Sequence, residues 1–185
     1  MKHNIYILLL AITIGFTQCC KEKPTNSDDN NLPGLPPAKQ TGANTLGFLL
    51  NGEPWTPAGN NGTANLSIDF DPGFNDGILN ISAYSSANLS ISQLVLFIKD
   101  SLNRLTTAPF TYKIGKNFLG GVIYTDPNSC ERYSEDSTNY CNGLITITKL
   151  ERPSNIVAGV FECTVFNPSC GDTVKITNGR FDMKF

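Results

Sequence analysis

The sequence is short of the residue types on which many catalytic sites depend. Its single histidine, His3, stands in an N-terminal segment with the character of a cleaved export signal. Once that segment is removed, no imidazole remains for a Ser-His-Asp or Cys-His catalytic group or for a histidine-ligated metal site. We therefore expect no cofactor and no catalysis of these kinds.

Charge is also scarce. Charged residues make up 16 % of the chain, and the formal net charge at pH 7 is −2. Proteins that bind nucleic acids hold the phosphate backbone with a surplus of lysine and arginine, which this chain lacks. We therefore expect no nucleic-acid partner.

No apolar run is long enough to cross a membrane as a helix, which takes about 20 residues. The run at residues 5–16 is typical of the hydrophobic region of a secretory signal. It leads to Cys19 and Cys20, and a cysteine directly after such a region resembles the lipobox of bacterial lipoproteins, in which the thiol is acylated. We assign acylation to Cys19, because Phe16 stands where the pattern has a large apolar residue, and Cys20 is the alternative.

Residues 1–18 are thus predicted to be a lipoprotein signal peptide, with an ordinary signal peptide as the other interpretation. The protein would be exported and anchored by its acyl chains to the outer membrane, facing the periplasm or the cell exterior. Residues 19–43 are rich in proline, asparagine and aspartate and nearly lack apolar side chains. Such a segment cannot bury enough surface to offset its ordering entropy, so we predict a disordered tether before a domain at 44–185.

From residue 44 onward, short alternations of apolar and polar residues recur between turn residues. Strands are predicted at 45–51, 64–70, 78–84, 93–99, 110–114, 121–125, 144–150, 156–166 and 173–185. The strand at 93–99 is apolar on both faces and is predicted to be central. The pattern predicts an all-β fold, an antiparallel two-sheet β-sandwich of about nine strands. The expected core residues are Trp55, Phe97, Phe161, Val165, Phe181 and Phe185.

Four further cysteines, an even number in a chain predicted to be exported, favour two disulfide bonds. Three pairings are possible. We predict that Cys130 pairs with Cys141 and Cys163 with Cys170, because the first bond would close a polar loop and the second would hold a turn. A zinc site with four thiolate ligands is disfavoured, since no Cys-x-x-Cys pair is present.

Asp69, Asp71 and Asp76 place oxygen ligands at a spacing that superficially suits calcium. The segment departs from the EF-hand pattern, with Phe74 where the loop needs glycine and Asn80 where it needs glutamate. We therefore interpret it as a hairpin loop, with a calcium site as the weak alternative.

Three aromatic side chains are candidates for ligand contact. Tyr133 and Tyr140 lie in the loop between Cys130 and Cys141, and loops that are held in place often carry function. Trp55 could stack on a sugar ring, although a lone tryptophan in a sandwich is more often part of the core.

Carboxylates are the remaining candidates for acid–base chemistry. Glycoside hydrolysis uses two of them on either side of the scissile bond. The sequence singles out no pair among Asp69, Asp71, Asp126, Glu151, Glu162 and Asp172.

Four stretches resemble those of a family of uncharacterised Bacteroidetes-type lipoproteins. They are residues 35–45 (LPPAKQTGANT), 47–57 (GFLLNGEPWTP), 143–150 (GLITITKL) and 171–182 (GDTVKITNGRFD). The resemblance implies a lipoprotein with a C-terminal all-β domain. It implies no catalytic residue, because the family carries no assigned activity.

The first functional hypothesis is therefore a lipid-anchored, non-enzymatic module that binds a glycan or an envelope protein. The alternatives are a small carboxylate-dependent polysaccharide hydrolase and a structural accessory subunit of an envelope complex.

Overall fold

A computed structural model describes residues 32–60, 62–86, 90–105 and 107–185. The predicted signal peptide, both candidate lipidation sites, Cys19 and Cys20, and the first part of the predicted tether lie outside these residues. Within the described ranges, no helix has the length and apolar character needed to cross a membrane.

Strands account for nearly all of the regular structure. They are β1 (Thr45–Leu50), β2 (Glu53–Trp55), β3 (Leu66–Asp71), β4 (Ile78–Ser85), β5 (Ser92–Ile98), β6 (Phe110–Ile114), β7 (Gly120–Thr125), β8 (Glu131–Tyr133), β9 (Tyr140–Glu151), β10 (Ile156–Asn167) and β11 (Asp172–Lys184). Two single-turn 3₁₀ helices, η3 (Leu102–Arg104) and η4 (Arg152–Ser154), complete the described elements. The all-β prediction is confirmed. Sequence analysis missed β2 and β8, whose three residues each are too few to show an alternation.

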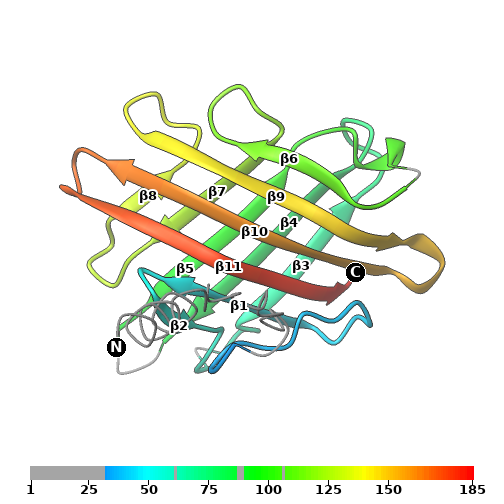
Figure 1. The fold of residues 1–185 in the computed structure, drawn as a ribbon, viewed down its shortest axis with the longest axis horizontal. Helices are drawn as coiled ribbons and strands as arrows, with labels where there is room; N and C mark the ends of the chain where they lie inside the picture. The colour runs from blue at the N-terminus through cyan, green and yellow to red at the C-terminus, as the bar shows by residue number, and fades with distance from the viewer. Residues whose placement is uncertain (1–31, 61, 87–89, 106) are drawn as a thin grey trace, which may run out of the picture.

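The strands form one continuous sheet in the order β2-β1-β11-β10-β9-β6-β7-β5-β4-β3, with β8 paired to β7. The sequence had predicted two separate sheets. In Figure 1, β11, β10, β9 and β6 form a front layer that crosses over a back layer of β7, β5, β4 and β3. The sheet therefore curls so that its two halves face each other, and β5 is an interior strand of the back layer, paired with β4 and β7.

Two glycine–phenylalanine pairs allow close packing on the long front strands. Gly159 on β10 lies opposite Phe181 on β11, and Phe161 on β10 lies opposite Gly179. A Cβ atom at Gly159 would stand 2.5 Å from Phe181 Cζ, and one at Gly179 would stand 2.7 Å from the Phe161 ring. Each ring thus covers the glycine across from it, and both rings are buried in the core.

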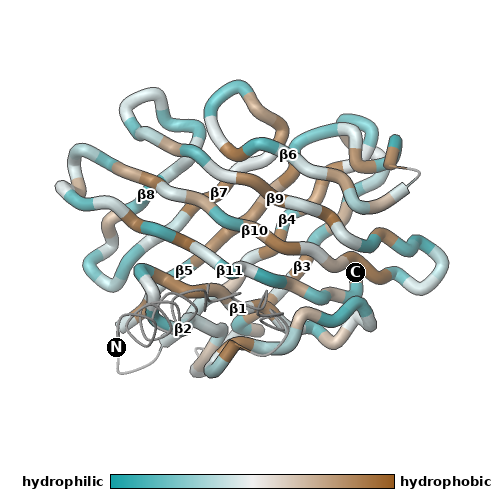
Figure 2. Tube along the Cα trace, viewed as in Figure 1, coloured by the Kyte–Doolittle hydropathy of each residue, from teal (hydrophilic) through white to brown (hydrophobic). Residues whose placement is uncertain are grey.

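The core lies between the two layers, and its aromatic contacts hold the strands at both ends of the strand order, β2 and β3. At one end, Trp55 of β2 stacks on Phe48 with ring centroids 4.7 Å apart, and its Nε1 donates to Ser92 Oγ of β5 at 2.8 Å. At the other end, Phe70 of β3 packs on Phe185 with centroids 4.7 Å apart. Figure 2 shows hydrophobic stretches along the crossing strands and hydrophilic residues in the loops at their ends.

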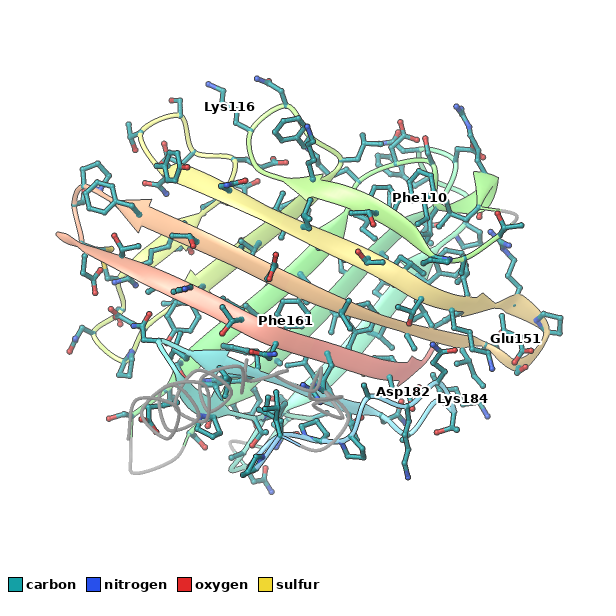
Figure 3. All side chains as sticks on the ribbon, viewed as in Figure 1. Phe110, Lys116, Glu151, Phe161, Asp182 and Lys184 are labelled. Atoms are coloured by element: carbon teal, nitrogen blue, oxygen red, sulfur yellow. A yellow bond between two sulfur atoms is a disulfide. The ribbon has the colours of Figure 1, made fainter. Side chains whose placement is uncertain are left out.

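Residues 32–43, predicted to belong to the tether, lie against the domain in the structure. Asp182 on β11 accepts hydrogen bonds from the Thr41 amide at 3.0 Å, the Thr41 hydroxyl at 3.1 Å and the Gly42 amide at 2.6 Å. Pro36 lies within contact distance of β1. Asp182, labelled in Figure 3, therefore joins the last strand to the segment that precedes the first.

Asp182 is only 1 % exposed. Burial by itself would raise the pKa of its carboxyl, but hydrogen bonds from the amides of residues 41–43 lower that pKa instead. The carboxylate is thus the form that the folded protein stabilises.

The disulfide bond joins Cys130 to Cys170, with Cα atoms 5.9 Å apart. Cys141 and Cys163 have free thiols. The predicted pairings, Cys130 with Cys141 and Cys163 with Cys170, were wrong.

The reason lies in the strand register. Cys141 and Cys163 alternate with outward residues on β9 and β10 and so face the core, away from the surface loops. Burial raises the pKa of Cys141 to about 11 and raises that of Cys163 further. The loop before β8 instead meets the β10–β11 turn, where Asn167 Nδ2 donates to Glu131 O at 2.7 Å.

We expect non-reducing peptide mapping of the oxidised protein to recover Cys130 joined to Cys170. The bond spans a sequence separation of 40 residues. In the chain-entropy model, a loop of that size contributes about 4 kcal/mol to the free energy of unfolding, which Cys130→Ser with Cys170→Ser should remove. A peptide joining Cys130 to Cys141 would contradict the structure.

Changing Asp182→Asn should lower the free energy of unfolding at pH 7 by roughly 2–3 kcal/mol, because charge-assisted hydrogen bonds are lost. The lowered pKa means that the carboxylate's contribution is present above about pH 4 and is lost as the pH falls through the folded-state pKa. The difference between the native protein and the variant should therefore shrink at pH 3 in urea unfolding. Asp69→Asn, on an exposed position of β3, is the control. An equal difference at both pH values would contradict this account.

Candidate functional site

The sheet opens on one side of β6. This strand pairs with β9 through five residue pairs but with β7 only where Ile114 meets Gly120. β6 ends at Ile114 and β7 begins at Gly120, so no residue of β7 pairs with the earlier part of β6, and η3 and the β6–β7 turn line the gap. The result is a groove with a volume of about 460 Å³. We refer to it as the β6 groove.

The walls of the β6 groove are mostly apolar. Leu105, Phe110, Tyr112, Phe118 and Leu119 all line it. Phe110, Phe118 and Leu119 are 45 %, 43 % and 40 % exposed, so they present apolar surface to any molecule that enters. Phe110, labelled in Figure 3, lies on β6 at the edge of the front layer, and its ring meets the Tyr112 ring edge-on at 5.0 Å.

Backbone hydrogen bonds hold three loops together at this end of the fold. Amides of residues 101–103 donate to carbonyls of residues 75–77 at 2.8–3.1 Å. The Lys99 amide donates to Leu119 O at 2.9 Å. Gly77 has a φ of +100°, and a side chain there would collide with the backbone of residue 103. The groove is therefore bounded by a fixed framework.

Tyr112 carries a hydrogen-bond donor without an acceptor. Its side chain is only 4 % exposed, and its hydroxyl oxygen has no hydrogen-bond partner. Burial, and to a lesser extent the negative charge of Asp100, raises the pKa of Tyr112 to about 12. The hydroxyl is therefore protonated at neutral pH. A buried, unpaired donor costs about 1–3 kcal/mol, which an incoming acceptor would relieve.

The rim of the groove carries both signs of charge. Arg104 pairs with Asp76. Lys113 Nζ lies 5.5 Å from the centroid of the Phe118 ring, within range of a cation–π contact. Asp100 is close enough to influence both Arg104 and Tyr112 electrostatically.

The structure does not bring the candidate calcium ligands together. Asp69 points outward from β3, Asp71 Oδ1 accepts from the Gly73 amide at 2.8 Å, and Asp76 pairs with Arg104. In the part of the chain that the structure describes, no cluster of three or more acidic, cysteine or histidine side chains could hold a metal ion. The segment is a hairpin loop that supports the β6 groove.

The three aromatic candidates are separated as well. Trp55 is buried in the core, as the interpretation favoured from the sequence had it, and does not present its ring to a ligand at the surface. Tyr133 is half-buried, and its hydroxyl donates to Glu135 Oε2 at 2.9 Å. Tyr140 is 60 % exposed, but it begins β9 on a loop without the expected disulfide. None of the three lines the β6 groove.

Two candidate carboxylates do meet, but around a cation. Arg132 is only 1 % exposed, and its guanidinium donates to Asp126 Oδ2 at 3.2 Å and also to Asp172. Burial by itself would raise the pKa of Asp126, yet the hydrogen bonds from the Cys130 amide and from Arg132 lower it. A general acid needs a raised pKa, so Asp126 is suited to stabilising the fold through Arg132 and not to donating a proton.

The other candidate carboxylates give no such pair. Glu151 is held by Ser154 and Lys149, which lower its pKa. Glu162 lies on the outer face of β10.

Sequence analysis missed the residues of the β6 groove. Phe110, Tyr112 and Ile114 alternate with polar residues in a predicted strand. A strand that is paired on both edges would show the same alternation. The gap exists because β7 pairs with β6 at one residue only, and that pairing cannot be read from the alternation within β6.

The sequence profile described as a domain of unknown function, DUF6252, matches residues 58–183. No curated protein and no solved structure matches the chain. The matched range covers β3 to β11 almost completely and includes every residue that lines the β6 groove. Membership of an uncharacterised family was the expectation from the resemblance. Because the match covers more than half of its length, the chain belongs to the DUF6252 family of domains of unknown function.

Proposed function

We propose that the chain is an exported, lipid-anchored module of the cell envelope, of the Bacteroidetes lipoprotein type, which binds its partner without transforming it. The lipobox-like Cys19 after an apolar segment supports the anchor. The Cys130–Cys170 disulfide supports export, because such bonds persist in oxidising compartments.

The observation that carries the binding function is the β6 groove. It combines partly exposed aromatic walls, a framework of backbone hydrogen bonds and the unpaired Tyr112 hydroxyl. Apolar pockets with a few placed polar groups are the usual form of a small-ligand site.

The position of the groove suits an anchored protein. Residues 32–43 lie beyond β11 at one margin of the front layer, while β6 is its other margin (Figure 1). An anchor that precedes residue 32 would therefore leave the groove facing away from it.

The hydrolase alternative has less support. The carboxylate pair of Asp126 and Asp172 is bridged by Arg132, and the pKa of Asp126 is lowered. An accessory role, in which a neighbouring envelope protein covers the groove, is the second candidate, because the exposed Phe118 and Leu119 suit a protein interface as well.

Palmitate labelling of cells that express the full chain tests the anchor. We expect the protein to incorporate label and to sediment with the outer membrane. Cys19→Ala should abolish the label and Cys20→Ala should keep it. The reverse result would assign acylation to Cys20, and an unlabelled native protein would refute the lipid anchor.

A thermal-unfolding screen of glycans, envelope lipids and apolar metabolites tests the binding function. A ligand at 100 times its Kd adds about 2.7 kcal/mol to the free energy of unfolding, which raises Tm by several degrees in a domain of this size. The shift should disappear in Phe118→Ser, which alters a groove wall, and should persist in Tyr140→Ser. If no compound class shifts Tm, the accessory role takes precedence.

A further inference from the structure

The chemistry of the β6 groove narrows the class of ligand, given the binding function proposed above. We propose that the groove takes a mostly apolar, uncharged molecule that presents one acceptor oxygen, such as a carbonyl or ether oxygen, to the Tyr112 hydroxyl. The argument rests on the walls, the unpaired donor and the balance of charge around the opening.

The walls select an apolar body. Phe110 and Phe118 offer aromatic surfaces, and Leu105 and Leu119 offer aliphatic ones. A volume of about 460 Å³ lies within the range of about 300–1,000 Å³ that is typical of sites for small organic ligands. An apolar molecule of that size would remove the exposed parts of these side chains from water.

The donor selects an acceptor. The Tyr112 hydroxyl is buried and unpaired, and it stays protonated because burial raises its pKa. A ligand that brought only further donors would leave it unpaired. Protein atoms cover the hydroxyl oxygen in this structure, so a ligand reaches it only after a neighbouring side chain moves. A carbonyl or ether oxygen would then satisfy the donor, which would favour such ligands.

Charges of both signs lie at the groove. The cations Arg104 and Lys113 line it, and Asp76 and Asp100 lie close enough to act on Arg104 electrostatically. Asp76 already neutralises Arg104, and Asp100 lies close enough to Tyr112 to disfavour an anion beside the hydroxyl. An ionised head group therefore gains no net electrostatic attraction from these side chains, and an uncharged ligand is at no disadvantage.

Nile red and 8-anilinonaphthalene-1-sulfonate test the inference. Nile red is uncharged and carries a carbonyl oxygen, whereas the sulfonate is an anionic aromatic dye. The protein is the full chain with Cys19→Ser and Cys20→Ser, which removes any acylation. We expect saturable, one-to-one binding of Nile red with a blue-shifted emission, at least ten times tighter than binding of the sulfonate.

The variants locate the site and identify the donor. Leu119→Ser in the groove and Leu144→Ser on the outer face of β9 are matched, because each leucine is 40 % exposed. Only Leu119→Ser should weaken Nile red binding. Tyr112→Phe should weaken it by about 3–10-fold, the usual worth of a neutral hydrogen bond. The same variant should unfold at an equal or higher temperature than the native protein, because it removes an unpaired buried hydroxyl.

Equal binding of Nile red by Tyr112→Phe would overturn the role of the donor. An equal loss in Leu144→Ser would place the dye elsewhere, and sulfonate binding as tight as that of Nile red would overturn the preference for uncharged ligands. If Nile red fails to bind but a compound of another class shifts Tm in the thermal screen, the ligand inference falls and the binding function stands.

Discussion

The architecture depends on one strand that belongs to both layers. β6 pairs along its length with β9 in the front layer and reaches the back layer through a single pair, Ile114 with Gly120. This sparse pairing marks the place where the sheet passes from one layer to the other. The same sparse pairing leaves the gap that forms the β6 groove.

Two buried polar groups of the described structure join its segments, whereas the buried Tyr112 hydroxyl has no partner, a state that it shares with Arg132 Nε, Glu135 Oε1 and Asn139 Oδ1. Asp182 accepts hydrogen bonds from Thr41 and Gly42, and the Arg132 guanidinium binds two carboxylates. These groups fix the N-terminal segment and the loop before β8 to the sheet. The Tyr112 hydroxyl fixes nothing, although it is as protected from water. A buried donor without a partner reduces stability, and its place in a residue that lines an apolar groove motivates the proposal of a ligand that supplies the acceptor.

The groove and the proposed anchor lie at opposite margins of the front layer. The front layer separates them, with the N-terminal segment beyond β11 and the groove beside β6. The long strands β10 and β11 give this layer its rigidity through the reciprocal packing of Phe161 and Phe181 over glycines.

The sequence by itself determined the fold class and the position of nearly every long strand, because strand periodicity is a local property of side chains that alternate between core and solvent. It also identified Phe161, Val165 and Phe181 as core residues. It could not determine that Cys130 meets Cys170, or that Asp126 and Asp172 share Arg132, because these contacts join segments about 40 residues apart along the chain. Nor could it find the β6 groove, since Phe110 and Tyr112 show the same alternation whether or not a strand lies beside them. Only the tertiary structure decided these features. Strand order and register set which faces of which strands meet, whereas the sequence shows the alternation within a strand but not the strand that will pair with it.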